Sequence, residues 1–167
     1  MKVFKPKMYK RSIYDINYED LKKKNVKVII FDLDNTLIGI DEEPDNKLIK
    51  FIERLKKSFK IIVASNNTKE RVKKVCDKIN CDYLYSILKP TKLLKKYFNK
   101  KVNNSFSETV IIGDQIVTDI FLGNRLGIYT ILVDHKKEKD LKITKLNRIL
   151  EKRIMKNLRI KRGEYYE

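Results

Sequence analysis

Strand-like apolar runs alternate with segments of helical periodicity along most of this chain. Five strands are predicted, over residues 26–31, 61–64, 82–84, 109–112 and 128–133. Apolar residues at helical spacing predict four helices between these strands, over Asp45–Lys57, Thr68–Ile79, Thr91–Phe98 and Ile116–Leu126. Short connections and right-handed crossovers then predict an α/β fold with a doubly wound parallel sheet and helices on both faces.

Two basic segments flank this α/β core of residues 26–134, and we expect all 167 residues to form a single domain. Residues 1–25 are interpreted as an N-terminal arm and residues 135–167 as a C-terminal helix. That helix carries an apolar stripe of Leu146, Ile149, Leu150, Ile154 and Leu158 beside Lys142, Lys145, Arg148, Lys152, Arg153 and Lys156. We expect the stripe to pack on the domain with the charges in water, and docking to an anionic surface is the alternative.

The positive charge gathers at the two ends of the chain. Of a net charge of +17, residues 1–27 contribute +6, residues 135–167 contribute +7, and the central 107 residues only +4. A near-neutral core with basic ends indicates an anionic partner such as phosphate groups, nucleic acid or an acidic membrane surface. General compositional drift explains the same numbers, because lysine outnumbers arginine by 31 to 8.

Several classes of protein are excluded by what the sequence lacks. The longest apolar runs have about five residues, far from the roughly 18 that span a bilayer, and no signal-peptide pattern precedes the core. Cys76 and Cys81 have no metal-site spacing and are interpreted as reduced residues of a cytoplasmic protein. His135 is the single histidine, which argues against Ser-His-Asp catalysis and histidine-rich zinc sites.

Two aspartates follow the first predicted strand in the stretch FDLDNTLIG. Alternate residues of a strand point to opposite faces, so Asp32 and Asp34 are expected to project the same way while Leu33 faces the core. Because two crowded carboxylates repel each other, a positive group is expected between them.

Polar residues follow the other predicted strands as well. Ser65, Asn66 and Asn67 follow the second, Lys89 follows the third, and Asp114 and Asp119 follow the fourth. Each has an ordinary explanation as a turn, a helix cap or a surface residue. However, parallel strands deliver their carboxyl ends to one edge, where ligands bind, and acids gathered there suit Mg²⁺.

These motifs together resemble a known superfamily. FDLDNTL, Ser65-Asn66-Asn67, Lys89-Pro90 and GDQIVTD look like the four motifs of haloacid dehalogenase (HAD)-type phosphatases. The arm residues Ser12–Ile16 and the stretch GDQIVTDIFLGNRLGIYTILV are similar to the YqeG branch, which is related to phosphatidylglycerophosphate phosphatases. The resemblance covers about residues 8–160 and implies a Rossmann-like, HAD-like fold.

The resemblance implies a role for each matching residue. Asp32 resembles the nucleophile that forms an aspartyl-phosphate, and Asp34 the general acid/base. A magnesium ion would be held by Asp32, the main-chain carbonyl of Asp34 and Asp114. Residues of the other motifs would act on the phosphoryl group or support the site: Ser65, Asn66 and Lys89 as substrate-binding groups, Lys89 also in catalysis, and Asp119 and Thr36 as supporting residues. Whether Asp119 binds the ion or orients Lys89 is left open by its spacing.

The lengths between the motifs limit the substrate. Neither Leu37–Ser65 nor Asn67–Lys89 leaves room for a cap domain, so the site is expected to be open to large or surface-bound substrates. With the basic ends and the YqeG resemblance, this favours dephosphorylation of phosphatidylglycerophosphate by an enzyme peripheral to the inner face of the membrane. The alternatives are a phosphatase for a protein, a nucleic-acid end or a soluble sugar phosphate, and a non-catalytic module that binds RNA or an anionic surface. Nucleic acid is the less favoured partner because no RNA-reading aromatic pattern is evident.

Overall fold

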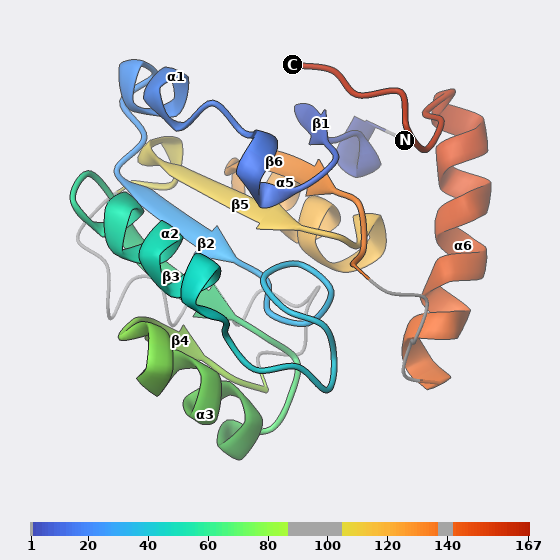
Figure 1. The fold of residues 1–167 in the computed structure, drawn as a ribbon. Helices are drawn as coiled ribbons and strands as arrows, with labels where there is room; N and C mark the ends of the chain where they lie inside the picture. The colour runs from blue at the N-terminus through green and yellow to red at the C-terminus, as the bar shows by residue number, and fades with distance from the viewer. Residues whose placement is uncertain (1, 87–104, 137–141) are drawn as a thin grey trace.

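A parallel sheet of six described strands forms the centre of the molecule (Figure 1). The computed structural model describes residues 2–86, 105–136 and 142–167. Along the chain the strands are β1 (Met8–Lys10), β2 (Val28–Phe31), β3 (Lys60–Ala64), β4 (Asp82–Leu84), β5 (Thr109–Gly113) and β6 (Tyr129–Val133). Their order in the sheet is β1-β6-β5-β2-β3-β4, and every neighbouring pair is parallel. The five predicted strands are all present, and the α/β prediction is confirmed.

Helices and single turns connect the strands. The α-helices are α1 (Tyr18–Lys23), α2 (Asn46–Lys56), α3 (Lys69–Ile79), α5 (Phe121–Leu126) and α6 (Lys142–Leu158). Three 3₁₀ turns, η1 (Lys2–Phe4), η2 (Ile13–Asp15) and η3 (Phe106–Glu108), and one π-helical turn, η4 (Ile116–Ile120), complete the set. The predicted helix Thr91–Phe98 lies outside the described residues, as does Lys89.

Polar side chains begin the two longer helices on one face of the sheet. The Asp45 carboxylate accepts the Leu48 N–H at the start of α2, and the Thr68 hydroxyl accepts the Arg71 N–H at the start of α3. These caps satisfy backbone donors that the first helical turn leaves without partners. The polar residues between each apolar run and the next helix therefore fix where α2 and α3 begin.

The sheet is buried on both faces. In β2, Ile29 and Phe31 belong to the hydrophobic cluster that contains the inner residues of α2 and α3. The alternate residues Val28 and Ile30 belong to a second cluster with Leu122 of α5. Strands buried on both sides carry continuous apolar runs, which explains why these strands were predictable. Figure 1 shows α2 and α3 in front of the sheet and α5 behind it.

The N-terminal arm contains a strand that the sequence analysis did not predict. Met8, Tyr9 and Lys10 of β1 pair with Ile131, Leu132 and Val133 of β6 at the edge of the sheet. Tyr9 also exchanges backbone hydrogen bonds with Tyr166, at 2.9 and 3.0 Å. The segments near the two ends of the chain therefore lie side by side. This strand lies in a lysine-rich arm without a run of apolar residues like those of the central strands, so only its pairing with β6 reveals it.

The C-terminal helix packs differently from the expected stripe. Ile154 and Met155 are buried and Leu158 is partly buried against η4 and β6, whereas Ile149 and Leu150 are exposed. Glu151, which lies between Leu150 and Ile154 in the sequence, faces inward and is 2% exposed. The inward face thus runs through Glu151, Ile154, Met155 and Leu158, which turns Ile149 and Leu150 outward. Leu146 lies in the part of α6 whose side chains the structure does not describe.

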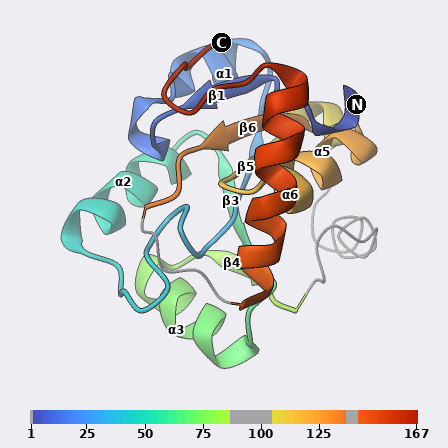
Figure 2. The same ribbon diagram turned by 90° about the vertical axis from the view of Figure 1, so that its right-hand side faces the viewer.

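Helix α6 stands at the side of the molecule toward which β2 and β5 run. Figure 2, turned so that this side faces the viewer, shows α6 in front of the strands. Among the described residues, no helix combines the length and the apolar character needed to cross a bilayer. The two views place α6 beside the carboxyl ends of β2 and β5 (Figures 1 and 2).

A hydrogen-bond network around Asp134 joins the C-terminal segment to the sheet. The Asp134 carboxylate, just after β6, accepts hydrogen bonds from the Tyr9 hydroxyl, from the Tyr165 hydroxyl at 2.7 Å and from the Arg162 guanidinium at 3.1 Å. Burial by itself would raise the pKa of Asp134, but these three donors outweigh it and lower the pKa below its ordinary value of 3.8. Asp134 therefore contributes to stability in its charged form.

The Asp134→Asn variant tests this network. A carboxylate whose pKa is lowered by folding stabilises the protein above its ordinary pKa and loses that contribution as the pH falls through the folded-state value. We expect the free energy of unfolding of Asp134→Asn to be lower by about 1–3 kcal/mol at pH 7, and the deficit to shrink below pH 3.8. Urea denaturation across this range measures both. The control is Asp77→Asn, which removes an exposed carboxylate paired with Lys73; a deficit that does not change with pH would contradict the assignment.

Candidate active site

A tight loop holds Asp32 at the end of β2. Its N–H donates to the Ile112 carbonyl of β5 at 2.9 Å, so the residue still belongs to the parallel pairing. Leu33 is fully buried in the core, as predicted, and its carbonyl accepts the N–H groups of residues 36, 37 and 38. Asn35 has a φ of 67°, a conformation that asparagine tolerates better than most residues. The loop therefore carries Asp32 and Asp34 immediately before and after the buried Leu33.

Three buried carboxylates meet at this edge of the sheet. One carboxylate oxygen from each of Asp32, Asp114 and Asp119 lies within 4.8 Å of the others. Asp32 is 8% exposed, and Asp114 and Asp119 are fully buried. The structure thus brings together Asp32 and Asp114, which the sequence analysis selected as metal ligands, and adds the carboxylate of Asp119, whose role was left open. The side chain of Asp34 is not a member of this group.

The π-helical turn η4 carries Asp119 into the group. Both the Asp119 and the Ile120 N–H groups donate to the Gln115 carbonyl, the second closing the wide ring of a π turn at 3.3 Å. One Asp119 carboxylate oxygen accepts the Gln115 N–H and the Thr118 hydroxyl, each at 3.3 Å. The predicted single helix over Ile116–Leu126 is therefore split into η4 and α5. This turn type follows from tertiary packing and has no signal in the apolar periodicity.

Asp34 is held by residues of the next motif. One of its carboxylate oxygens accepts the side-chain amide of Asn67 at 3.0 Å, and the other accepts the Arg71 guanidinium at 3.3 Å. Arg71 also donates to the carbonyls of Gly39, at 3.1 Å, and Glu42, at 2.9 Å. A single guanidinium thus fixes both Asp34 and the loop that follows it. Arg71 was not predicted as a site residue, because it lies among charged residues of α3 that have the pattern of a solvated face.

The other predicted site residues have different surroundings. Ser65 is buried at the end of β3, and its Oγ accepts the Asn67 N–H at 3.0 Å, which leaves its hydroxyl proton for a further acceptor. Asn66 is exposed, and Asn67 is the residue that contacts Asp34. Thr36 is buried, and its Oγ1 has no hydrogen-bond partner among the described residues, which suits a site that a further ligand completes. Lys89 lies outside the described residues, so its predicted role stays a prediction.

Two further residues from the C-terminal part of the chain hold the site loops. The Lys136 N–H donates to the Asn35 carbonyl at 3.1 Å and its ammonium donates to the Leu37 carbonyl. Burial lowers the pKa of the Lys136 ammonium. On the other side, the Glu151 carboxylate of α6 accepts the Ile116 N–H, two residues after Asp114, and pairs with Arg162 at 3.6 Å. Neither contact is visible in the sequence, because both join segments far apart along the chain.

The aspartate cluster fits a hard divalent cation. Its donors are all carboxylate oxygens, the ligands that Mg²⁺ prefers, and sulfur ligands are not among them. The two cysteines are elsewhere and free, and burial raises the pKa of the Cys76 thiol to about 12 and of the Cys81 thiol to about 11. Three carboxylates buried this close repel one another, so a cation is the group that the cluster best accommodates.

Gly113 offers a direct test of the cluster. A Cβ at this position would overlap the Asp119 carboxylate, so we expect Gly113→Ala to displace Asp119 and to weaken Mg²⁺ affinity at least about tenfold. Calorimetric Mg²⁺ titration measures the affinity. The double variant Gly113→Ala/Asp119→Ala is the control: a stability loss much smaller than the sum of the two single losses supports the overlap, and additive losses would contradict it.

Comparisons with known proteins agree with this geometry. The family model described as mitochondrial PGP phosphatase matches residues 1–137. The chain is 39% identical over 165 residues to a probable phosphatase YqeG of Bacillus subtilis (strain 168), covering 96% of this chain and 94% of that protein.

Two solved structures share the fold. An uncharacterized protein from Listeria monocytogenes serotype 4b has a TM-score of 0.55 and 17% identity, covering 79% of this chain and 99% of that one. A predicted HAD-like family hydrolase from Porphyromonas gingivalis has a TM-score of 0.54 and 14% identity, and the match covers 75% of this chain and 98% of that one. The family match and the 39% identical relative show that the chain belongs to the PGP phosphatase family, and its fold is similar to that of a HAD-like hydrolase.

Proposed function

We propose that this phosphatase hydrolyses phosphomonoesters with the aid of Mg²⁺ and through a phosphoryl group carried on Asp32, and that its substrate is phosphatidylglycerophosphate. The observation that carries the proposal is the meeting of Asp32, Asp114 and Asp119 within 4.8 Å at the carboxyl edge of the sheet. Such an edge is where open α/β sheets bind ligands. The carboxylates of Asp32, Asp114 and Asp119 and the main-chain carbonyl of Asp34 are the groups that would hold Mg²⁺.

In the first step, a carboxylate oxygen of Asp32 forms a bond to phosphorus while the ester bond to the leaving oxygen breaks. Asp34 donates a proton to that oxygen as it departs. In the second step, Asp34 takes a proton from water, the water oxygen bonds to phosphorus, and the bond between Asp32 and phosphorus breaks. Bound Mg²⁺ supplies positive charge that reduces the repulsion between the carboxylate and the phosphate dianion.

Positioning of Asp34 is the part of this scheme that the described contacts support in most detail. Asn67 and Arg71 donate to its two carboxylate oxygens, so the side chain is held in one orientation. The buried Ser65 hydroxyl supports phosphoryl binding by donating its free proton to a phosphoryl oxygen. Lys89 is proposed to neutralise charge on those oxygens in the transition state.

The surface of α6 favours a lipid substrate over the alternatives. Ile149 is 69% exposed and Leu150 is 51% exposed. Around them the exposed positions of the helix and its end carry Lys152, Arg153, Lys156 and Arg159. The only acid between residues 142 and 159 is Glu151, which is buried. Exposed apolar side chains among cations are typical of helices that lie in the surface of an anionic membrane.

Access to the site also suits a large substrate. Between Leu37 and Ser65 the chain forms only a short loop, α2 and β3, and between Asn67 and Ser86 only α3 and β4. No cap domain is inserted in these two described stretches. We propose that the enzyme lies on the cytoplasmic face of a membrane, with α6 in contact with the bilayer and the carboxyl edge of the sheet beside it (Figure 2).

Replacement of the proposed nucleophile tests the chemistry. We expect Asp32→Asn to lower the turnover of an aryl phosphate by about 10³-fold or more, because the amide cannot form the phosphoryl intermediate. The matched control, Asp41→Asn, removes an exposed carboxylate of the same loop and should keep full activity. Unfolding curves should show both variants folded; turnover that survives in purified Asp32→Asn would refute the assignment.

A panel of substrates separates the lipid from the alternatives in the same assay. Phosphate release is measured from phosphatidylglycerophosphate in mixed micelles, a phosphopeptide, a 5′-phosphorylated oligonucleotide and a sugar phosphate. We expect the highest kcat/KM for the lipid. A higher kcat/KM for one of the other three would identify that class as the substrate. If none of these four compounds is hydrolysed and the aryl phosphate is not hydrolysed either, a non-catalytic role is favoured.

The membrane contact predicts an effect of α6 that is separate from catalysis. We expect Ile149→Glu/Leu150→Glu to reduce sedimentation with anionic vesicles at least about tenfold, because two exposed apolar side chains become charged. Hydrolysis of a soluble aryl phosphate should not change. Lys50→Glu, on the exposed side of α2, lowers the net charge by the same amount and is the control. Equal vesicle binding by both variants would refute the docking surface.

A further inference from the structure

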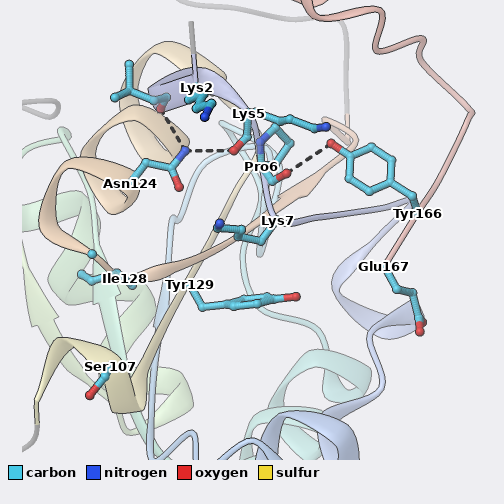
Figure 3. Close-up of a pocket in the computed structure, with 12 residues that line it drawn as sticks. Lys2, Lys5, Pro6, Lys7, Ser107, Asn124, Ile128, Tyr129, Tyr166 and Glu167 are labelled. Atoms are coloured by element: carbon cyan, nitrogen blue, oxygen red, sulfur yellow. Dashed lines mark hydrogen bonds between the residues drawn. The ribbon is translucent and has the colours of Figure 1, made fainter.

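A cavity of about 940 Å³ lies near the amino ends of β5 and β6, whereas the aspartate cluster lies at the carboxyl ends of the strands. Its lining includes Lys2, Lys5 and Lys7 before β1, Tyr129 at the start of β6, and the C-terminal residues Tyr166 and Glu167 (Figure 3). Asp32 and Asp114, by contrast, follow the last residues of β2 and β5. The cavity is therefore separate from the site of phosphoryl transfer, and the proposed mechanism uses none of its residues.

The wall formed by residues 2–7 is fixed by hydrogen bonds. The Asn124 side-chain amide donates to the Val3 carbonyl at 2.9 Å and to the Lys5 carbonyl at 3.0 Å. The Tyr166 hydroxyl donates to the Pro6 carbonyl at 3.3 Å, and Figure 3 shows these bonds on two sides of the wall. Lys7 is anchored by its N–H, which donates to the Thr130 carbonyl at 3.0 Å. The backbone is thereby held while the lysine side chains are left exposed.

The charge of the lining is strongly unbalanced. Glu167 is the one acid among the lining residues, and its carboxylate pairs with Lys10 at 2.6 Å. The hydrogen bond from Lys10 is the main reason that the pKa of Glu167 is lowered. The Glu167 carboxylate is therefore charged at neutral pH and is already paired with Lys10. Within the described parts of the chain, no ion pair engages Lys2, Lys5 or Lys7. A fourth ammonium, that of Lys24, lies 5.6 Å from the centre of the Tyr129 ring.

The lining also offers apolar area. Val3, Pro6, Ile128 and the Tyr129 ring contribute to the same cavity. Its volume lies within the range of about 300–1,000 Å³ that is typical of sites for small organic ligands and exceeds what an inorganic anion fills. Lysine ammonium groups bind phosphate as point charges, and several lysines around a concave surface concentrate anions there.

We propose that this cavity, which we call the lysine pocket, binds an organic phosphate that carries at least two negative charges. The phosphate lies among Lys2, Lys5 and Lys7, and the organic part lies against Tyr129 and Ile128. Both a free phosphorylated metabolite and a phospholipid head group have this chemistry. The ligand holds the segments near the two ends of the chain together, so its binding stabilises the fold.

Binding of two probes tests the lysine pocket. ADP represents a free organic phosphate, and monomeric short-chain phosphatidate represents a head group. Each is titrated calorimetrically into the full-length protein in the presence of a chelator, so that neither is hydrolysed at the aspartate cluster. We expect Lys5→Gln/Lys7→Gln to weaken binding of at least one probe tenfold or more and to abolish the rise in Tm that the probe causes. Turnover of an aryl phosphate should stay unchanged, since these lysines lie outside the catalytic site.

A matched variant separates the pocket from the general positive charge. Lys22→Gln/Lys23→Gln removes the same charge from α1, where both lysines are exposed and paired with acids. Selective loss for the pocket variant with ADP identifies a free phosphate, and selective loss with phosphatidate alone identifies a head group. Equal effects of the two variants, or no binding of either probe to the wild type, would overturn the proposal. The test does not depend on catalysis and stays informative if the proposed function fails.

Discussion

Mutual repulsion among three buried carboxylates is the constraint around which this edge of the molecule is built. Asp32 and Asp114 arrive there because β2 and β5 are parallel neighbours that end side by side, and Asp119 arrives through a π-helical turn. Burial strengthens the repulsion, since little water is present to screen it. A divalent cation bound there would relieve this repulsion, and its positive charge would also favour the phosphoryl transfer that we propose.

The loops that carry these acids are held by charged residues from distant segments. Arg71 of α3 binds Asp34 and two carbonyls of the following loop, Lys136 binds the Leu37 carbonyl, and Glu151 of α6 accepts the Ile116 N–H. The loops that follow β2 and β5 are therefore each anchored by a residue from outside their own motif. The contact through Glu151 also gives α6 two roles, because its inner face holds the loop after Asp114 while its outer face presents Ile149 and Leu150 to the surroundings.

The sequence predicted the central strands, the α/β class and the meeting of Asp32 with Asp114, because fully buried strands are continuous apolar runs and parallel strands end at a common edge. It did not predict β1, whose three residues are defined by pairing with β6. Asp119 stayed ambiguous because a π turn has no signal in apolar periodicity. Arg71 and Glu151 were missed since each lies among charged residues of a helix, and only tertiary packing selects the one that turns inward. The predicted burial of Ile149 and Leu150 in α6 was wrong for the same reason, since tertiary packing turns Glu151 inward and these two residues outward.

We propose that the aspartate cluster, with Mg²⁺ bound, directs phosphoryl transfer onto Asp32. Acid quenching during turnover of a phosphomonoester, followed by borohydride reduction and peptide mass spectrometry, identifies the residue that carries the phosphoryl group. We expect Asp32 to be converted to homoserine only when both substrate and Mg²⁺ are present. Modification of another residue under these conditions would contradict it, as would steady hydrolysis in which no residue is modified.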